Sequence, residues 1–362
     1  MKKARLASSC RCWCLVLLVL VAATSVAAQQ GRIVQEKLRG ASLGNIVTGD
    51  SPERTITVYL PPSYDTAPQK RYPVVYILPG IQDNEEQWIR PWRQGDEWGT
   101  IQDVMDRSIA ENRTGEMILV VSEQRTQMGG SFYTNSAASG NWEDFTVKDL
   151  VGYIDGRYRT LARAESRGIM GHSMGGYGAI KLAMKHPDVF SVAYGMNPAV
   201  LGWAGDLGPE NPGFAGALRA TPENLRSFGF YTAAVLCVGQ AFSPNPAKPP
   251  FFVDLPFEMR DGTMQPVEPA FSRWEENMPL YMVKQYRANL MELRGLQFDS
   301  GVSDEFTHIP VTSRALSIRL TSLGVPHIFE EYNGDHRNRL WGRQGRISII
   351  IFPYFSRLLE KQ

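Results

Sequence analysis

The sequence has 362 residues, of which 43% are hydrophobic and 21% are charged, an ordinary globular composition with enough length to bury a large core. Lys and Arg number 38 against 37 Asp and Glu. This balance, without any run of basic residues, argues against a nucleic-acid-binding protein, and we expect no nucleic acid partner.

The first 28 residues differ from the rest of the chain. Basic residues precede an apolar stretch, CWCLVLLVLVAA, which is followed by the small residues of TSVAAQQ. This order predicts a secretory signal peptide over residues 1–28, cleaved near Ala27 or Ala28. An uncleaved anchor is the alternative, but the apolar stretch is short for a membrane span. We therefore expect an exported protein, periplasmic or extracellular, without stable membrane insertion after cleavage.

Cleavage would remove three of the four cysteines and leave Cys237 alone, so the mature chain could form no intramolecular disulfide. Cys237 lies in the apolar run YTAAVLCVGQ, and such a cysteine more often packs in a core than reacts. We interpret it as a packing residue.

Residues 29–362 form one predicted domain in which strands and helices alternate. Strands are expected at 54–64, 72–80, 116–123, 167–171, 190–199, 293–299 and 327–334, and helices at 144–158, 175–186, 310–324 and 338–359. This alternation predicts an α/β fold, with a mostly parallel central sheet covered by helices on both faces. Ligands of such sheets bind beyond the carboxyl ends of the strands, where the chemistry is to be sought.

One segment, 202–285, interrupts this alternation. It holds 11 of the 23 prolines and many aromatic residues, and it lies between two expected strands. A long insertion at the end of a strand either covers the site or only packs beside it. We expect a cap that helps to select the substrate.

Several glycines flank Ser173 in the sequence GHSMGG, between an apolar strand and a helix. The pattern G-x-S-x-G in this context is typical of a nucleophile elbow, in which a strained turn exposes the serine oxygen. The sequence GASLG (40–44) matches the same pattern, but no buried strand precedes Ser42. We therefore predict Ser173 as the nucleophile.

A serine nucleophile needs a base, and the base needs an acid that orients it. Of the five histidines, His336 follows a late strand and fits the chain order serine, acid, histidine; His308 is the alternative. The acid is expected after the strand at 293–299, where Asp299, Asp304 and Glu305 are candidates. Position alone favours Asp304, since Asp299 at the strand end could simply cap a turn.

Two backbone N–H groups are expected to hold the negative oxygen formed during acyl transfer. One belongs to Met174, directly after the predicted nucleophile. The other is expected in the loop after the strand YILPG, where Ile81 is the best candidate and Gly80 permits a close approach.

Five motifs, VYLPPSYD, YPVVYILPGIQDNEEQW, GHSMGGYGAIKLAMKHPDVF, DSGVSD and YNGDH, occur in an order that resembles the esterase D family of α/β hydrolases. This family includes feruloyl and acetyl-xylan esterases, S-formylglutathione hydrolases, enterochelin-type esterases and mycolyltransferases. The resemblance implies that Asp304 is the catalytic acid, that His336 is the base and that Gly80 and Ile81 form the oxyanion loop. The chain departs from the family at Pro79, where histidine is usual, and in the length of 202–285.

The resemblance implies a serine carboxylesterase acting on a small or polysaccharide-linked ester such as a feruloyl, acetyl or other aryl or acyl ester. The predicted signal peptide makes it a secreted one, and because the sequence shows no cluster of metal ligands we expect no cofactor or metal. Two alternatives stay open: a mycolyl-type acyltransferase that moves the acyl group to a sugar hydroxyl, and a non-catalytic binding module on the same fold. The oligomeric state is left open.

Overall fold

The structure is a computed structural model that describes residues 30–44, 46–94 and 97–362. The predicted signal peptide, residues 1–28, lies outside the described residues. Within the described ranges, no helix combines the length and the apolar character that crossing a membrane would require.

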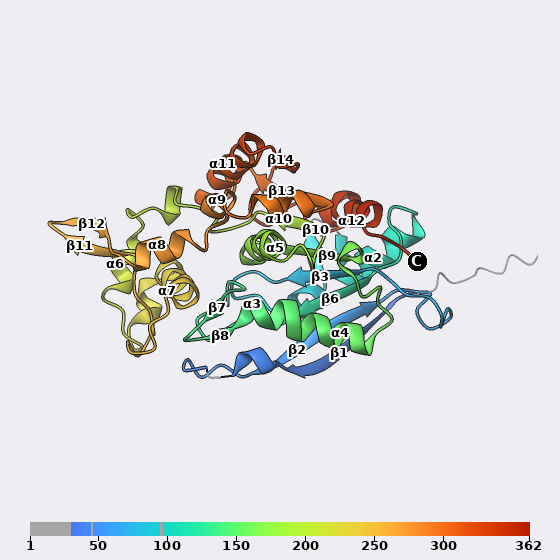
Figure 1. Cartoon of the computed structure of the whole chain (residues 1–362), viewed down its shortest axis with the longest axis horizontal. Helices are drawn as coiled ribbons and strands as arrows, with labels where there is room; N and C mark the ends of the chain where they lie inside the picture. The colour runs from blue at the N-terminus through green and yellow to red at the C-terminus, as the bar shows by residue number, and fades with distance from the viewer. Residues whose placement is uncertain (1–29, 45, 95–96) are drawn as a thin grey trace, which may run out of the picture.

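An eight-stranded sheet forms the centre of the molecule (Figure 1). Its strands, in spatial order, are β1 (Arg32–Arg39), β2 (Glu53–Leu60), β6 (Ile118–Ser122), β3 (Val74–Leu78), β9 (Arg167–His172), β10 (Val192–Met196), β13 (Gly295–Gly301) and β14 (Ile328–Tyr332). The pairs β1–β2 and β2–β6 are antiparallel, and all later pairs are parallel. The carboxyl ends of the six parallel strands therefore share one rim.

Strand β3 illustrates why the sequences of these strands are continuous apolar runs. All five of its residues are buried. Val74 and Tyr76 belong to the core on one face of the sheet, whereas Val75 and Ile77 belong to the core on the other face. Because successive side chains of a strand alternate between faces, a strand covered on both sides needs apolar residues throughout.

Helices cover both faces of the sheet, as predicted. One core contains side chains of α4 (Val151–Arg157), α5 (Met174–Lys185) and α11 (His308–Ser322). The opposite core contains side chains of α2 (Ile101–Ala110), the π-helical segment η6 (Ile347–Ile351) and α12 (Phe352–Leu358). Shorter elements complete this part of the chain: α1 (Glu86–Ile89), β4 (Trp92–Gln94), β5 (Glu97–Gly99), β7 (Asn135–Ser136), β8 (Gly140–Asn141), α3 (Trp142–Asp144), the π-helical segment η2 (Phe145–Leu150) and α10 (Arg287–Glu292).

Several elements differ from the sequence expectation. The final helix, expected from 338, begins only at Ile347, because the preceding residues form turns with positive φ at Arg339 and Gly342. The prediction also missed edge strand β1 and helix α2. The start of α2 carries a recognisable signal, a capping box in which Thr100 and Asp103 satisfy each other's backbone N–H groups.

The insertion 202–285 forms a lobe beside the sheet, drawn at the left of Figure 1. It contains α6 (Pro212–Ala217), α7 (Phe230–Phe242), β11 (Phe257–Arg260), β12 (Thr263–Pro266), α8 (Ala270–Glu275) and α9 (Pro279–Met282). Trp203 stacks on Phe271 and Trp274 at ring distances of 5.3 Å. Many of the aromatic residues therefore stabilise the lobe itself. Cys237 is buried in α7, as a packing residue would be, and burial raises the pKa of its thiol to about 12.

Candidate active site

Ser173 occupies a sharp turn between β9 and α5. Its backbone has φ 59° and ψ −118°, a conformation that costs energy for any residue other than glycine. The turn is held from both sides, since Ser173 N–H donates to the carbonyl of Met196 at 2.9 Å and Ala199 N–H donates to the carbonyl of Ser173 at 3.1 Å. The side chain thereby stands at the carboxyl rim of the sheet, as a nucleophile elbow requires.

The glycines around Ser173 permit contacts that no side chain would allow. A Cβ on Gly175 would lie 1.8 Å from the carbonyl oxygen of Leu78, and a Cβ on Gly171 would lie 2.3 Å from the backbone of Gly175. A Cβ on Gly176 would approach the carbonyl oxygen of Met196 to 2.8 Å. The first turns of α5 thus press against the ends of β3 and β10, which explains why the sequence places glycine at these positions.

His336 lies in the loop after β14, and its ring pairs with Asp304 in the loop after β13. Nδ1 of His336 is 2.8 Å from Oδ2 of Asp304, and both side chains are almost fully buried. Oδ1 of Asp304 also accepts the backbone N–H of Phe306 at 2.9 Å. This arrangement fixes the ring with Nδ1 toward the carboxylate, leaving Nε2 free to exchange a proton.

Burial sets the protonation of this pair. It lowers the pKa of the His336 imidazole to about 4, and it raises the pKa of the Asp304 carboxyl to about 6. At neutral pH, Asp304 is therefore ionised and His336 is neutral, the state in which an imidazole can accept a proton.

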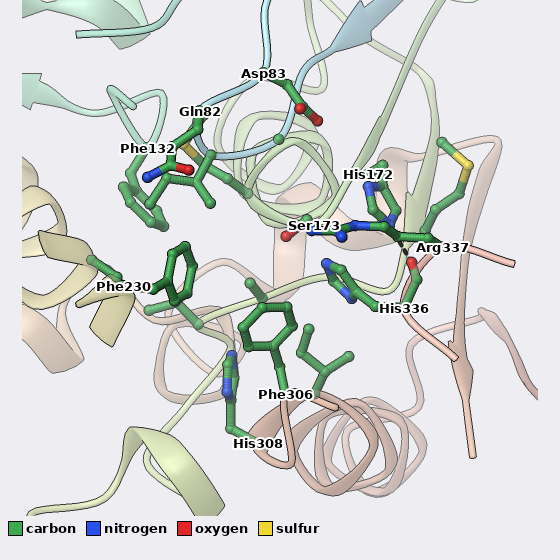
Figure 2. Close-up of a pocket in the computed structure, with 18 of the residues that line it drawn as sticks. Gln82, Asp83, Phe132, His172, Ser173, Phe230, Phe306, His308, His336 and Arg337 are labelled. Atoms are coloured by element: carbon green, nitrogen blue, oxygen red, sulfur yellow. Dashed lines mark hydrogen bonds between the residues drawn. The ribbon is translucent and has the colours of Figure 1, made fainter. Parts of the chain in front are cut away.

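Figure 2 shows Ser173 and His336 side by side in one cavity. No hydrogen bond joins their side chains in the described part of the chain. The other acid candidates have different partners. The carboxylate of Glu305 accepts the backbone N–H of His336 at 3.2 Å, so it contacts the chain of His336 but not its ring.

Asp299 was expected at the end of a strand, but it lies inside β13, which continues to Gly301, and it is fully buried. Its Oδ2 accepts hydrogen bonds from the Tyr194 hydroxyl at 2.7 Å and from Arg346 Nε at 2.9 Å. This network faces the core that contains α12, so Asp299 serves the packing of the sheet and not the cavity.

The predicted oxyanion donors also meet at the cavity. Ile81 and Met174 both line it, and neither backbone N–H has a hydrogen-bond partner among the described residues. Met174 is the first residue of α5, where an N–H has no acceptor within the helix. A Cβ on Gly80 would lie 3.5 Å from Cβ of Ser173, so the absence of a side chain there brings the loop close to the serine.

His172 was missed as a site residue, because it stands at a variable position of the G-x-S-x-G pattern. Its Nε2 donates to the carbonyl of His336 at 2.6 Å, and the two rings lie 4.6 Å apart. Nδ2 of Asn197 donates to the same carbonyl at 3.1 Å. These two side chains hold the backbone of the loop that carries His336, a contact for which the sequence offers no local signal.

The cavity has a volume of about 520 Å³ and is lined by residues from distant parts of the chain. Its walls combine the loop after β3, the start of α5, the start of α11, the loop after β14 and the insertion. The insertion contributes Asp206, Leu207, Asn211, Phe230, Tyr231, Ala234, Val235 and Val238. His308, the alternative base, also lines the cavity, but it pairs with Asp206 at 2.7 Å and not with Asp304.

The Esterase family model matches residues 51–344, which is most of the chain. This protein belongs to the Esterase family. The match contains the elbow, the loop after β3, and both residues of the Asp304–His336 pair. The resemblance to esterases noted from the sequence motifs is thereby confirmed.

Curated relatives and a solved structure agree with this assignment. An esterase of Mycobacterium tuberculosis is 30% identical over 142 residues, which are 38% of this chain and 27% of that protein. An endo-1,4-beta-xylanase/feruloyl esterase of Xylanibacter ruminicola is 27% identical over 140 residues, 38% of this chain and 18% of that protein. The matches thus span about a quarter or less of these curated relatives.

A solved ferulic acid esterase superimposes with a TM-score of 0.61 at 22% identity, covering 91% of this chain and 99% of the other. The predicted α/β-hydrolase fold is confirmed by this likeness and by the mostly parallel sheet.

Proposed function

We propose that this protein is an exported serine carboxylesterase that hydrolyses carboxylic esters through Ser173, His336 and Asp304. The observation that carries the proposal is the buried hydrogen bond between Asp304 and His336 at the cavity into which the strained Ser173 turn projects. Membership of the Esterase family supports it. The export depends on the predicted signal peptide, residues 1–28.

In the first half of the reaction, Oγ of Ser173 attacks the ester carbonyl carbon while Nε2 of His336 takes the hydroxyl proton. The ionised Asp304 stabilises the imidazolium that forms. The carbonyl oxygen becomes negative and accepts hydrogen bonds from the backbone N–H groups of Ile81 and Met174. Collapse of this intermediate breaks the bond to the alcohol, which leaves with the proton from His336.

In the second half, a water molecule attacks the acyl group on Ser173, and His336 now removes a proton from the water. The carboxylic acid departs as Ser173 regains its proton, so the enzyme returns to its initial state. The overall reaction consumes one water and yields one acid and one alcohol.

The cavity suits an acyl or alcohol group with a bulky apolar part. Phe132, Phe230 and Phe306 line it, and aromatic walls of this kind are common in sites for flat or bulky ligands. Two of the compared proteins are named as feruloyl or ferulic acid esterases, which supports aryl esters as the first substrates to test.

The experiment measures hydrolysis of p-nitrophenyl acetate and methyl hydroxycinnamates, together with covalent labelling by a fluorophosphonate. We expect the wild type to be active and labelled, and Ser173→Ala to lose both. Ser42→Ala is the matched control, because Ser42 lies in the same G-x-S-x-G pattern but on the 3-10 turn that follows edge strand β1. Labelling that persists in Ser173→Ala would refute the assignment, and acyl transfer to an added sugar in preference to water would favour a transferase.

A further inference from the structure

A second histidine–carboxylate pair lines the same cavity, apart from Asp304 and His336. Asp206 comes from the insertion, and His308 is the first residue of α11. Nδ1 of His308 is 2.7 Å from Oδ1 of Asp206. The carboxylate also accepts the backbone N–H of His308 at 2.8 Å and the hydroxyl of Tyr231 at 2.8 Å. Three hydrogen bonds thus fix the carboxylate of Asp206, and one of them orients the imidazole of His308.

These partners decide which ring nitrogen carries the proton. Burial alone would raise the pKa of Asp206, but the hydrogen bonds from His308 and Tyr231 outweigh it and lower the pKa to about 2. An ionised carboxylate only accepts hydrogen bonds, so Nδ1 of His308 must carry a proton. In the neutral ring, Nε2 therefore presents a lone pair, and it can bind only a donor.

Nε2 of His308 has no hydrogen-bond partner among the described residues, although it is buried and the residue is only 7% exposed. A buried polar nitrogen without a hydrogen-bond partner is unfavourable, and native proteins rarely leave one without a reason. The triad does not use this nitrogen, and the surrounding side chains do not satisfy it.

Aromatic side chains lie between Nε2 of His308 and the catalytic residues. In Figure 2, Phe306 lies between His308 and His336, with Phe230 beside it. The ring of Phe306 is 4.8 Å from that of His336, 6.5 Å from that of His308 and 5.6 Å from that of Phe230. An apolar group that packs on Phe306 can thus extend from the ester at Ser173 toward His308.

We propose that the Asp206–His308 pair is a specificity site that binds a hydroxyl group carried by the apolar part of the ester substrate. The hydroxyl donates to Nε2 of His308, while Phe230 and Phe306 pack against the adjoining carbon skeleton. This inference rests on the proposed esterase function and adds a residue pair that selects among esters. A hydroxyl satisfies the site, whereas a methoxy group, which has no proton to donate, does not.

The test compares kcat/KM for methyl 4-hydroxycinnamate, methyl 4-methoxycinnamate and methyl cinnamate. A second series, 4-hydroxyphenyl acetate against phenyl acetate, places the hydroxyl on the alcohol side of the ester. We expect the wild type to prefer the hydroxylated ester in at least one series. His308→Phe, which keeps a ring but removes the acceptor, should reduce that preference about tenfold, as expected for the loss of one hydrogen bond in a desolvated site.

Asp206→Asn is the second variant, because an amide in place of the carboxylate no longer forces the proton onto Nδ1. It should also reduce the preference for hydroxyl over methoxy. His186→Gln is the matched control. His186 forms a comparable pair with Glu143 at 2.9 Å, but neither residue lines the cavity. This control should keep the wild-type preference.

The outcomes separate the two proposals. Circular dichroism and thermal melting establish that each variant is folded. A folded His308→Phe protein with the wild-type preference in both series would overturn the specificity site while leaving the esterase in place. A wild type that hydrolyses none of these esters would overturn the proposed function and the specificity site together.

Discussion

Asp304 and Asp299 lie five residues apart, yet the structure gives them opposite surroundings. Asp304 contacts the ring of His336, whereas Asp299 forms a buried ion pair with Arg346. We expect Asp304→Asn to lower kcat roughly 10³- to 10⁴-fold, because the imidazolium loses its counter-charge and the ring loses its fixed tautomer. Stopped assays on purified protein with p-nitrophenyl acetate measure this effect.

Asp299→Asn is the comparison for this prediction. It should retain a kcat within a few-fold of the wild type and instead lower the free energy of unfolding, by about 1–3 kcal/mol, because Arg346 loses its fully buried carboxylate partner and keeps only Glu330. Denaturant titration followed by circular dichroism gives this number. The reverse ranking in kcat would move the catalytic acid to Asp299.

The dependence of kcat/KM on pH should be set by the protonation of Asp304 and His336. The active form has an ionised Asp304 and a neutral His336, and burial raises the pKa of Asp304 to about 6 while it lowers that of His336 to about 4. The active form is therefore almost fully present at neutral pH, about half present near pH 6, and lost as the pH falls further. We expect kcat/KM to be constant at neutral pH and to fall below about pH 6.

In Asp304→Asn the residual activity should depend on His336 alone, so its acidic limb should shift to lower pH. The measurement is kcat/KM between pH 4 and pH 9 for both proteins. An identical acidic limb in wild type and variant would contradict the assignment of that limb to the pair.

At the scale of elements, helix α7 and the hairpin β11–β12 divide the insertion into two parts with different roles. Phe230, Tyr231, Ala234, Val235 and Val238 of α7 line the cavity, but no residue of the hairpin does. The proposed cap function therefore belongs to α7 and the turn that carries Asp206. Because α7 also contributes to the main core, removing the whole insertion would expose that core.

We expect Phe230→Ala to lower kcat/KM for bulky aryl esters about tenfold more than for p-nitrophenyl acetate, since it removes one apolar wall of the cavity. The control replaces Glu258–Gln265 with an Asn-Gly turn between Phe257 and Pro266, which face each other in the hairpin. This shortened protein should rank the esters as the wild type does. A change of ranking in the control but not in Phe230→Ala would assign substrate selection to the hairpin.

For the molecule as a whole, the predicted signal peptide should be absent from the mature protein. The expectation follows from the basic start, the apolar stretch and the small residues before Gln29. N-terminal sequencing and mass spectrometry of the protein from fractionated cells check it. A start near Ala28 or Gln29 in the periplasm or the medium is expected, whereas an intact Met1 in the membrane fraction would indicate an anchor.

The sequence by itself determined the features that depend on local pattern. The apolar run at Val74–Leu78 identified a doubly buried strand, because both faces of a parallel strand exclude water. The glycines around Ser173 marked the turn, since no other residue permits such close backbone approaches. The motifs that carry the esterase resemblance placed the chain in its family before any contact was known.

The tertiary structure alone decided the features that depend on contacts between distant residues. Asp206 and His308 are 102 residues apart, and no motif pairs them, so only the packing of the insertion against α11 brings them together. For Asp304 and His336, 32 residues apart, the motifs predicted both residues, and the packing supplied the contact between them. His172 likewise contacts the carbonyl of His336 across 164 residues. Such a side-chain contact produces no periodic pattern in the sequence, because it depends on how the helices, strands and loops pack against one another.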